Sequence, residues 1–316
     1  MCRLLSIILF LILIFASSGK SQEQVDSAYI RPYNHRVILL GYAAKDILSL
    51  NVETPHREQH FMPNNPVKVG VGVDLNGTVL SFAYGYGFDF MRDKERGKTE
   101  SLDFQLHTYG RKMVFDVIVQ RYKGFYSEED FISDDFTLVP DLRIHQYGIN
   151  GQYILNNRRF SYKSAFNQSE RQLRSSGTVL LGGNAFLTKI KSDSTFFYYG
   201  RTKLDNVQIG ISAGYAYTWV LGRHWQITAA LSAGINIGSE TVARLYKGYI
   251  DVCPTALPRF SVAYTHSTWA IAVSFVSSMT FPVISDEETL GLLSGTARLT
   301  YFKRIADIPF LTKLFE

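Results

Sequence analysis

Strict alternation of residue types over long stretches is the feature that most constrains what this chain can fold into. In residues 207–219 the odd positions hold Val, Ile, Ala, Tyr and Trp, and the even positions hold Gln, Gly, Ser, Ala and Thr. Residues 225–237 repeat the alternation after Gly222-Arg223. Because successive side chains of a strand point to opposite faces, each stretch predicts a strand with one apolar face. Each stretch has 13 residues, whereas ordinary soluble strands have about five or six.

The composition agrees with a protein built from strands and excludes several other classes. Aromatic residues make up 14% of the 316 residues, with 19 Tyr and 22 Phe, and these types favour strands over helices. Only one apolar run is long enough to be considered as a membrane helix, at the N-terminus, which excludes a helical membrane bundle. The formal net charge of +5 comes without a basic cluster, so no nucleic-acid partner is expected.

The N-terminus has the features of a cleaved signal peptide. Met1-Cys2-Arg3 is a short positive segment, the run from Leu4 to Ala16 is apolar, and Ala16-Ser17-Ser18 supplies the small residues of a cleavage site. The apolar run of 13 residues is short for a membrane span, which needs about 20. We therefore expect residues 1–18 to be removed, and secretion gives the mature chain a route to the outer membrane.

Long alternating strands leave two folds open, a soluble β-sandwich and a transmembrane β-barrel. Tight turns, among them Arg111-Lys112, Asn156-Asn157 and His266-Ser267, alternate with long loops such as 123–142 and 167–175. Short turns at one end and long loops at the other are typical of outer-membrane barrels. The fold class we expect is therefore all-β, an antiparallel transmembrane β-barrel with strands near 47–53, 67–76, 78–88, 99–110, 113–122, 143–155, 158–166, 176–189, 195–201, 207–221, 224–238, 258–265, 268–281 and 291–303.

The strand count is expected to lie between 12 and 14, because segments 47–53 and 195–201 have the weakest patterns. An even count brings both termini to the periplasm. The chain then divides into a signal peptide, a periplasmic segment over residues 19–36, a barrel over residues 37–304 and a tail over residues 305–316.

The three tryptophans are expected at one end of this barrel. Trp219 and Trp225 flank the turn at Gly222, and Trp269 follows the turn at His266. All three lie on the apolar face, so they predict an aromatic girdle at the periplasmic interface.

The polar positions of the strands predict the lining of the lumen. Small residues dominate these positions in 207–221, 224–238 and 268–281, which suits either a wall against which something packs or a wide solvent channel. Elsewhere they are charged or polar, and such residues either bind a solute and select ions or form a paired filling. The candidate lumen-facing polar residues are Lys68, Asp74, Asp103, His107, Asp116, Gln120, Gln146 and Asn150.

Several motifs in order resemble the uncharacterised Bacteroidota family named domain of unknown function 4421. The resemblance covers most of residues 37–303 and implies an outer-membrane barrel of the cell envelope; it brings no activity, substrate or catalytic residue. The motifs are Met62-Pro63-Asn64-Asn65-Pro66, Gly70-Val71-Gly72-Val73, the run from Leu106 to Lys112, the run from Gln120 to Tyr126, Arg159 to Gln168 with Arg171-Gln172 and Ser175-Ser176-Gly177, and Gly214 to Thr218.

No constellation of residues predicts catalysis, a cofactor or a metal site. His56 and His60 have the i, i+4 spacing of a helical metal pair, but they lie in an expected surface loop without a third ligand. No Gly-x-Ser-x-Gly elbow occurs, and no spacing singles out a Ser, His and Asp trio. We therefore expect no enzyme, although a lipid-modifying enzyme stays open as the third reading.

Two other readings of the function remain. One is a pore or transport barrel for small solutes, in which loop 123–142, with Glu128, Glu129, Asp130, Asp134 and Asp135, folds inward as a cation-preferring constriction. The other is a non-conducting structural or lipid-contacting barrel. The expected partners are outer-membrane lipid, the barrel assembly machinery and, for the pore, a small solute. The chain is expected to be a monomer in the cell outer membrane. Glu170, Arg171 and Arg174 in loop 167–175 are either lipopolysaccharide contacts or ordinary loop residues.

Overall fold

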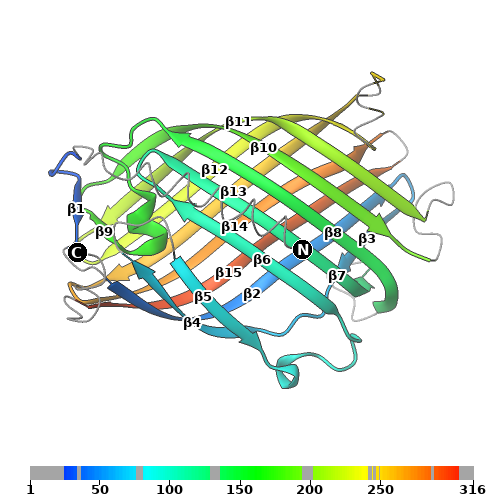
Figure 1. Cartoon of the computed structure of the whole chain (residues 1–316), viewed down its shortest axis with the longest axis horizontal. Helices are drawn as coiled ribbons and strands as arrows, with labels where there is room; N and C mark the ends of the chain where they lie inside the picture. The colour runs from blue at the N-terminus through cyan, green and yellow to red at the C-terminus, as the bar shows by residue number, and fades with distance from the viewer. Residues whose placement is uncertain are drawn as a thin grey trace, which may run out of the picture.

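The chain is a closed antiparallel barrel (Figure 1). The computed structural model describes residues 25–33, 37–75, 81–128, 136–193, 202–240, 244, 247–248, 250–285 and 288–305. Its strands are β1 (Ile30–Pro32), β2 (Val37–Thr54), β3 (Arg57–Met62), β4 (Lys68–Leu75), β5 (Ser81–Gly87), β6 (Glu100–Tyr109), β7 (Met113–Glu128), β8 (Phe136–Ile154), β9 (Glu170–Gln172), β10 (Ser176–Lys191), β11 (Lys203–Leu221), β12 (Trp225–Ser239), β13 (Asp251–Thr265), β14 (Trp269–Ile284) and β15 (Thr289–Ile305).

A ring of ten strands closes the barrel through its first and last strands. β15 pairs with β14 on one edge and with β2 on the other, in register from Ile305 opposite Val37 to Thr289 opposite Glu53. The ring continues from β2 through β3, β7 and β8 to β10–β15. Closure matters because an open strand edge in lipid leaves backbone donors and acceptors unpaired, at several kcal/mol each.

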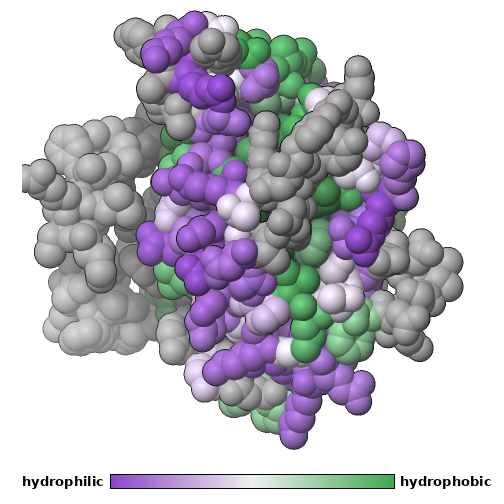
Figure 2. Space-filling model, turned by 90° about the vertical axis from the view of Figure 1, so that its right-hand side faces the viewer, coloured by the Kyte–Doolittle hydropathy of each residue, from purple (hydrophilic) through white to green (hydrophobic). Residues whose placement is uncertain are grey.

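The two ends of the barrel differ. We call the end that holds Val37 and Ile305 the terminal end; it lies at the left in Figure 1, with β1 and β9. The turns at 110–112, 222–224 and 266–268 and the segment 155–175 are at this end. The opposite end, which we call the loop end, carries hydrophilic residues gathered over its surface (Figure 2). Short turns, the start of β2 and the end of β15 mark the terminal end as the periplasmic one.

One strand is interrupted, so the number of strands in the wall differs between the two ends of the barrel. β3 and β4 both run antiparallel to β2, β3 beside residues 50–54 and β4 beside residues 37–44. They are two halves of one crossing strand, separated by residues 63–67. β3 joins β7 directly at the loop end, whereas β4, β5 and β6 are added to the wall at the terminal end. With β3 and β4 counted as one, the described chain contributes twelve strands to the wall.

The outer face is the apolar face that the alternation predicts. Val71 on β4, Ile211 on β11 and Ile235 on β12 are 66–75% exposed, as side chains that meet lipid are. Trp219, Trp225 and Trp269 all lie at the terminal end, and rings follow one another from Trp225 to Tyr264, Trp269 and Tyr301 with centroids 5.1, 5.6 and 6.3 Å apart. An apolar wall with an aromatic belt and a closed ladder is an outer-membrane β-barrel.

The expected strands differ from the observed ones in several places. β7, β8 and β13 are longer at the loop end than the expected strands 113–122, 143–155 and 258–265. Residues 158–166 are not a strand; they form turns and part of a π-helix at the terminal end. Residues 167–175, expected as an extracellular loop, belong to the same segment. The segment 47–53 is the end of the longer β2, and β3 covers Arg57 to Met62, where a loop was expected. Residues 195–201 lie outside the described residues, as do 1–24 and 306–316.

No helix among the described residues is long and apolar enough to cross a membrane.

Gly124 sits where β7 leaves β6 and continues toward β3. Its φ is +85°, the register of β7 with β8 shifts there, and a Cβ atom would overlap the carbonyl oxygen of Lys98. Thr99 donates a 2.7 Å hydrogen bond to the Gly124 carbonyl, so residue 98 is not free to retreat. We expect Gly124→Ala to lower the free energy of unfolding by about 2–3 kcal/mol, from left-handed strain plus the overlap.

Urea unfolding of the refolded barrel in lipid vesicles measures this difference. Gly222→Ala is the matched control, because Gly222 has φ +68° and no atom within 4 Å of its Cβ position. It isolates the backbone strain, expected at about 1 kcal/mol. Equal losses in the two variants would show that the Lys98 contact contributes nothing.

Candidate functional site

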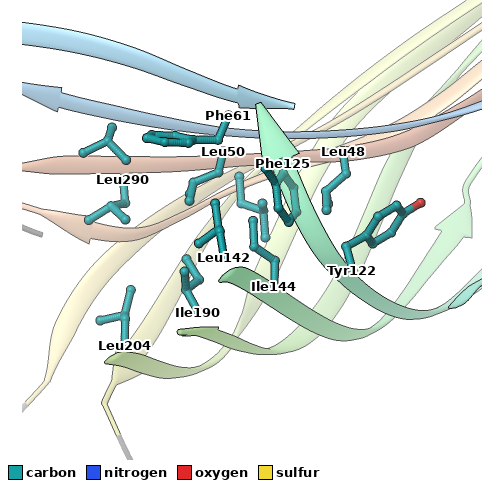
Figure 3. Close-up of a cluster of buried hydrophobic side chains, with 12 residues drawn as sticks. Leu48, Leu50, Phe61, Tyr122, Phe125, Leu142, Ile144, Ile190, Leu204 and Leu290 are labelled. Atoms are coloured by element: carbon teal, nitrogen blue, oxygen red, sulfur yellow. The ribbon is translucent and has the colours of Figure 1, made fainter. Parts of the chain in front are cut away.

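The lumen near the loop end is filled by apolar side chains. Figure 3 shows these side chains converging from strands on different sides of the barrel. All are buried, whereas side chains on the lipid face of the same strands are exposed. The cluster comprises Leu48, Leu50, Val52, Phe61, Tyr122, Phe125, Leu142, Ile144, Ile190, Leu204, Leu290 and Leu292. We call it the apolar layer. Inward apolar residues were not expected here, because the sequence patterns predict a polar lumen throughout.

A charged layer crosses the lumen below the apolar layer. Arg259 on β13 faces Asp116 on β7, which lies on the opposite side of the ring, and its guanidinium holds both carboxylate oxygens, with Nη1 3.2 Å from Oδ1. His107 Nδ1 lies 2.8 Å from Asp116 Oδ1, and Asn150 donates a 2.7 Å bond to Oδ2. Both members of the ion pair are almost fully buried. A bidentate pair of this kind fixes the two walls relative to each other.

A second polar group lies beside this layer. Tyr122 and Gln120 on β7 both donate to Asp103 on β6, Gln120 over 2.8 Å. Ser294 on β15 donates a 2.6 Å bond to Gln120, which connects β15 with β7 across the lumen. Gln105 donates to Asp103 over 3.0 Å.

The structure places the other candidate lumen residues at different heights. Lys68 pairs with Asp46, and Asp74 is buried near the terminal end, where it interacts with the positive charge of Lys163. Gln146 and Asn150 are both buried on β8. His107, Asp116 and Asn150 therefore come together in the charged layer. Asp103 and Gln120 meet in the neighbouring group, and Gln146 lies directly opposite Gln120 on β8. Lys68 and Asp74 belong to neither group.

Space in the charged layer is small. A cavity of about 10 Å³ is bounded by His107, Asp116, Arg259 and Ser277, among others. By this measure about one water molecule fits. His107 Nε2 and the Ser277 hydroxyl have no hydrogen-bond partner in the described chain. The layer can hold polar groups in place, but it has no room for a solute.

The terminal end is closed by the segment 155–175, which we call the plug. It contains the π-helix η2 (Lys163–Asn167) and β9. The small and polar inward residues of the wall hold it: Ser261 donates 2.8 Å to the Ala165 carbonyl, and Thr265 donates 2.9 Å to Gln168 Oε1. Gln226 donates to the Ser164 carbonyl. The sequence left two roles open for the small inward residues, a packing wall or a wide solvent channel. In the structure they form a wall against which the plug packs.

Aromatic packing and ion pairs fix the plug further. Phe160 and Tyr162 are fully buried, and the ring of Phe166 stacks on Tyr109 of β6 at 4.8 Å. Burial raises the pKa of Tyr162. Glu170 pairs with Arg111 in the β6–β7 turn and accepts a 2.6 Å bond from Ser161. Glu170 is thus bound at the periplasmic end and is not an extracellular contact.

An N-terminal strap lies over the plug. Residues 25–33 form this strap, in which β1 pairs with β9 and Ile30 is opposite Gln172. The Leu173 amide donates a 2.7 Å bond to Tyr29 O. The Arg304 guanidinium lies 3.9 Å from the Tyr33 ring centroid. Burial raises the pKa of Tyr33, although the positive charges of Arg304, Arg171 and Arg31 act against the rise.

Other sequence candidates do not assemble. His56 lies exposed in the β2–β3 turn, whereas His60 is buried on β3 with Nδ1 2.9 Å from Asn51 Oδ1. No group of three potential metal ligands occurs within the described residues. Much of the expected acidic loop is strand, because β7 runs to Glu128 and β8 starts at Phe136; Arg96 donates a 2.8 Å bond to Glu128. Residues 129–135, which hold Glu129, Asp130, Asp134 and Asp135, lie outside the described ones.

Arg259 is the main lumen residue that the sequence candidates lack. It belongs to the expected strand 258–265, where Phe260 and Val262 are on the apolar face. Parity alone would therefore have placed Arg259 inward. Parity also gives a signal for part of the apolar layer, because Ile144 has the parity of Gln146 and Asn150, while Arg143 and His145 hold the other face of β8.

Several known proteins are similar to this chain. The chain is similar to the translocator domain of the autotransporter NalP from Neisseria meningitidis (8% identity, 95% of each chain covered, TM-score 0.41). It is also similar to the outer membrane protease OmpT from Escherichia coli (7% identity, 90% of this chain and 100% of that one, TM-score 0.33). No curated protein matches. The model of the family described as domain of unknown function (DUF4421) matches residues 24–282, and the chain belongs to that family.

Proposed function

We propose that this protein is a non-conducting outer-membrane barrel that acts through its lipid-facing wall and its two ends. The observation that carries the proposal is a lumen filled at three successive levels. The apolar layer occupies the loop half, the ion pair of Arg259 and Asp116 crosses the middle, and the plug occupies the terminal end. Each level joins strands from opposite sides of the ring.

A pore needs a continuous polar path, and this arrangement supports none through the described residues. Ions that enter at the loop end would meet Leu48, Leu142 and Leu290, which offer no group to replace a hydration shell. The cavity of about 10 Å³ beside His107 is also too small for a substrate. The same packing therefore supports a barrel without a catalytic site in its lumen.

Single-channel recording of the refolded mature chain in a planar bilayer tests the proposal. We expect a folded protein with heat-modifiable gel mobility and no discrete conductance steps, because every level of the lumen is packed. An open general porin, inserted under the same conditions, shows that the recording detects channels, and a boiled sample shows what unfolded chain does. Reproducible steps that disappear on boiling would overturn the proposal and restore the pore reading.

A further inference from the structure

The rim of the terminal end carries a cationic cavity that the sealed lumen does not explain. The cavity measures about 180 Å³, and Arg171 of the plug, Arg223 and His224 of the β11–β12 turn, and Trp225 line it. Arg171 is half-buried and donates to the backbone carbonyl of Arg223, so the plug and the β11–β12 turn are joined where both arginines line the cavity. His224 Nδ1 lies 2.9 Å from the Thr265 carbonyl, so Nδ1 donates there and the ring is held in one orientation.

No acidic residue lines this cavity, and the turns and segments around it are basic. Lys and Arg outnumber Asp and Glu by eleven to two in the described residues 25–33, 110–112, 155–175, 222–224, 266–268 and 303–305. The two acids are occupied elsewhere, Glu170 by Arg111 and Asp26 by Arg159 at 3.1 Å. Arg171 and Arg304 also lie close enough for their positive charges to repel each other. Several cations are therefore held together without a compensating anion from the described chain.

The cavity lies at the height of the membrane interface. Trp225 lines it, and the same residue begins the row of rings that runs through Tyr264 and Trp269. Aromatic girdles mark the level of lipid headgroups. A guanidinium pair at that level meets the phosphates of the leaflet, and planar guanidiniums bind phosphate oxygens in pairs.

We propose that Arg171 and Arg223 form a binding site for the phosphate of an anionic phospholipid in the periplasmic leaflet. His224 lies beside that phosphate, and Trp225 packs at the glycerol and upper acyl region. The site deepens the lipid-contacting role proposed above, but it needs only the orientation of the barrel and not a closed lumen. A barrel that conducts ions yet binds this lipid would overturn the earlier proposal alone.

Lipid titration of the refolded full chain in detergent micelles tests the site. The probes are short-chain phosphatidylglycerol, short-chain phosphatidylcholine and inorganic phosphate, with tryptophan fluorescence as the readout because Trp225 borders the cavity. Each basic residue near an anionic lipid surface contributes about fivefold in binding constant. We expect saturable binding of phosphatidylglycerol that Arg171→Gln with Arg223→Gln weakens on the order of 25-fold, with little binding of phosphatidylcholine.

Two further variants separate charge from structure. Lys191→Gln with Lys203→Gln removes two charges at the loop end, where both side chains are more than half exposed, and should leave binding unchanged. Arg171→Lys with Arg223→Lys keeps the charges and should retain most of the affinity. Arg223→Gln alone, in an exposed turn, serves if the double variant fails to fold. Unchanged phosphatidylglycerol binding in the Gln variants would overturn the site, and equally tight binding of inorganic phosphate would replace the lipid with a soluble phosphate ligand.

Discussion

Asp116→Ala is expected to lower the free energy of unfolding of the barrel by about 3–5 kcal/mol, the usual loss when one member of a buried ion pair is removed. Arg259 is 3% exposed and would keep its charge with no carboxylate in reach. His107 and Asn150 would lose their acceptor at the same time. Urea unfolding in lipid vesicles, followed by gel mobility, measures the loss.

The double variant Asp116→Ala with Arg259→Met gives the sharper result. With both charges removed, an apolar side chain of similar length occupies the middle of the lumen, and we expect most of the stability to return, since buried pairs are often replaceable by apolar groups. Asp193→Ala is the surface control: its pair with Lys191 spans 4.0 Å between exposed side chains and should cost well under about 1 kcal/mol. If Asp116→Ala cost no more than Asp193→Ala, the charged layer would contribute nothing to holding the walls together.

The sequence predicts the wall of this barrel well because lipid imposes a simple rule on it. Outward residues within the membrane are apolar. The alternation therefore predicts both a strand and its lipid-facing side, as it does at Val69, Val71, Ile209 and Ile211. The same rule located the tryptophan girdle. It also explains the missed β3: its residues Arg57 to Gln59 lie at the loop end, where no lipid selects apolar side chains.

The contents of the lumen follow no comparable rule, and the sequence predicts them poorly. Phe160 and Tyr162 alternate with Ser161 and Lys163 as in a strand, yet both rings are buried in the plug. An aromatic side chain satisfies lipid and a packed lumen equally well, so its identity does not say which one it meets. Leu50 and Ile144 pose the same difficulty, because inward apolar residues have meaning only once the opposite wall is known.

Phe160→Ala is expected to undock the plug without unfolding the barrel. Phe160 is fully buried and packs edge-on against Tyr162 at 4.9 Å, so its truncation should cost about 3–5 kcal/mol of plug docking. The plug contains five tryptic sites, at Arg158, Arg159, Lys163, Arg171 and Arg174. When cleavage passes through local opening, a loss of about 3 kcal/mol raises its rate on the order of 100-fold. Limited trypsin digestion, with cut sites read by mass spectrometry, measures this rate.

Phe260→Ala is the matched control, because it removes the same ring from the lipid face, where Phe260 is 41% exposed. It should leave cleavage within the plug unchanged. A Phe160→Ala barrel that stays folded and shows the same tryptic cleavage as Phe260→Ala would mean that the wall contacts of Ser261, Thr265 and Gln226 hold the plug without its aromatic core. Rapid cleavage at Lys163 and Arg171 beside an intact barrel would instead identify the plug as a separately released unit. The proposed phosphate site would then be lost together with it, since Arg171 is one of the two arginines that form it.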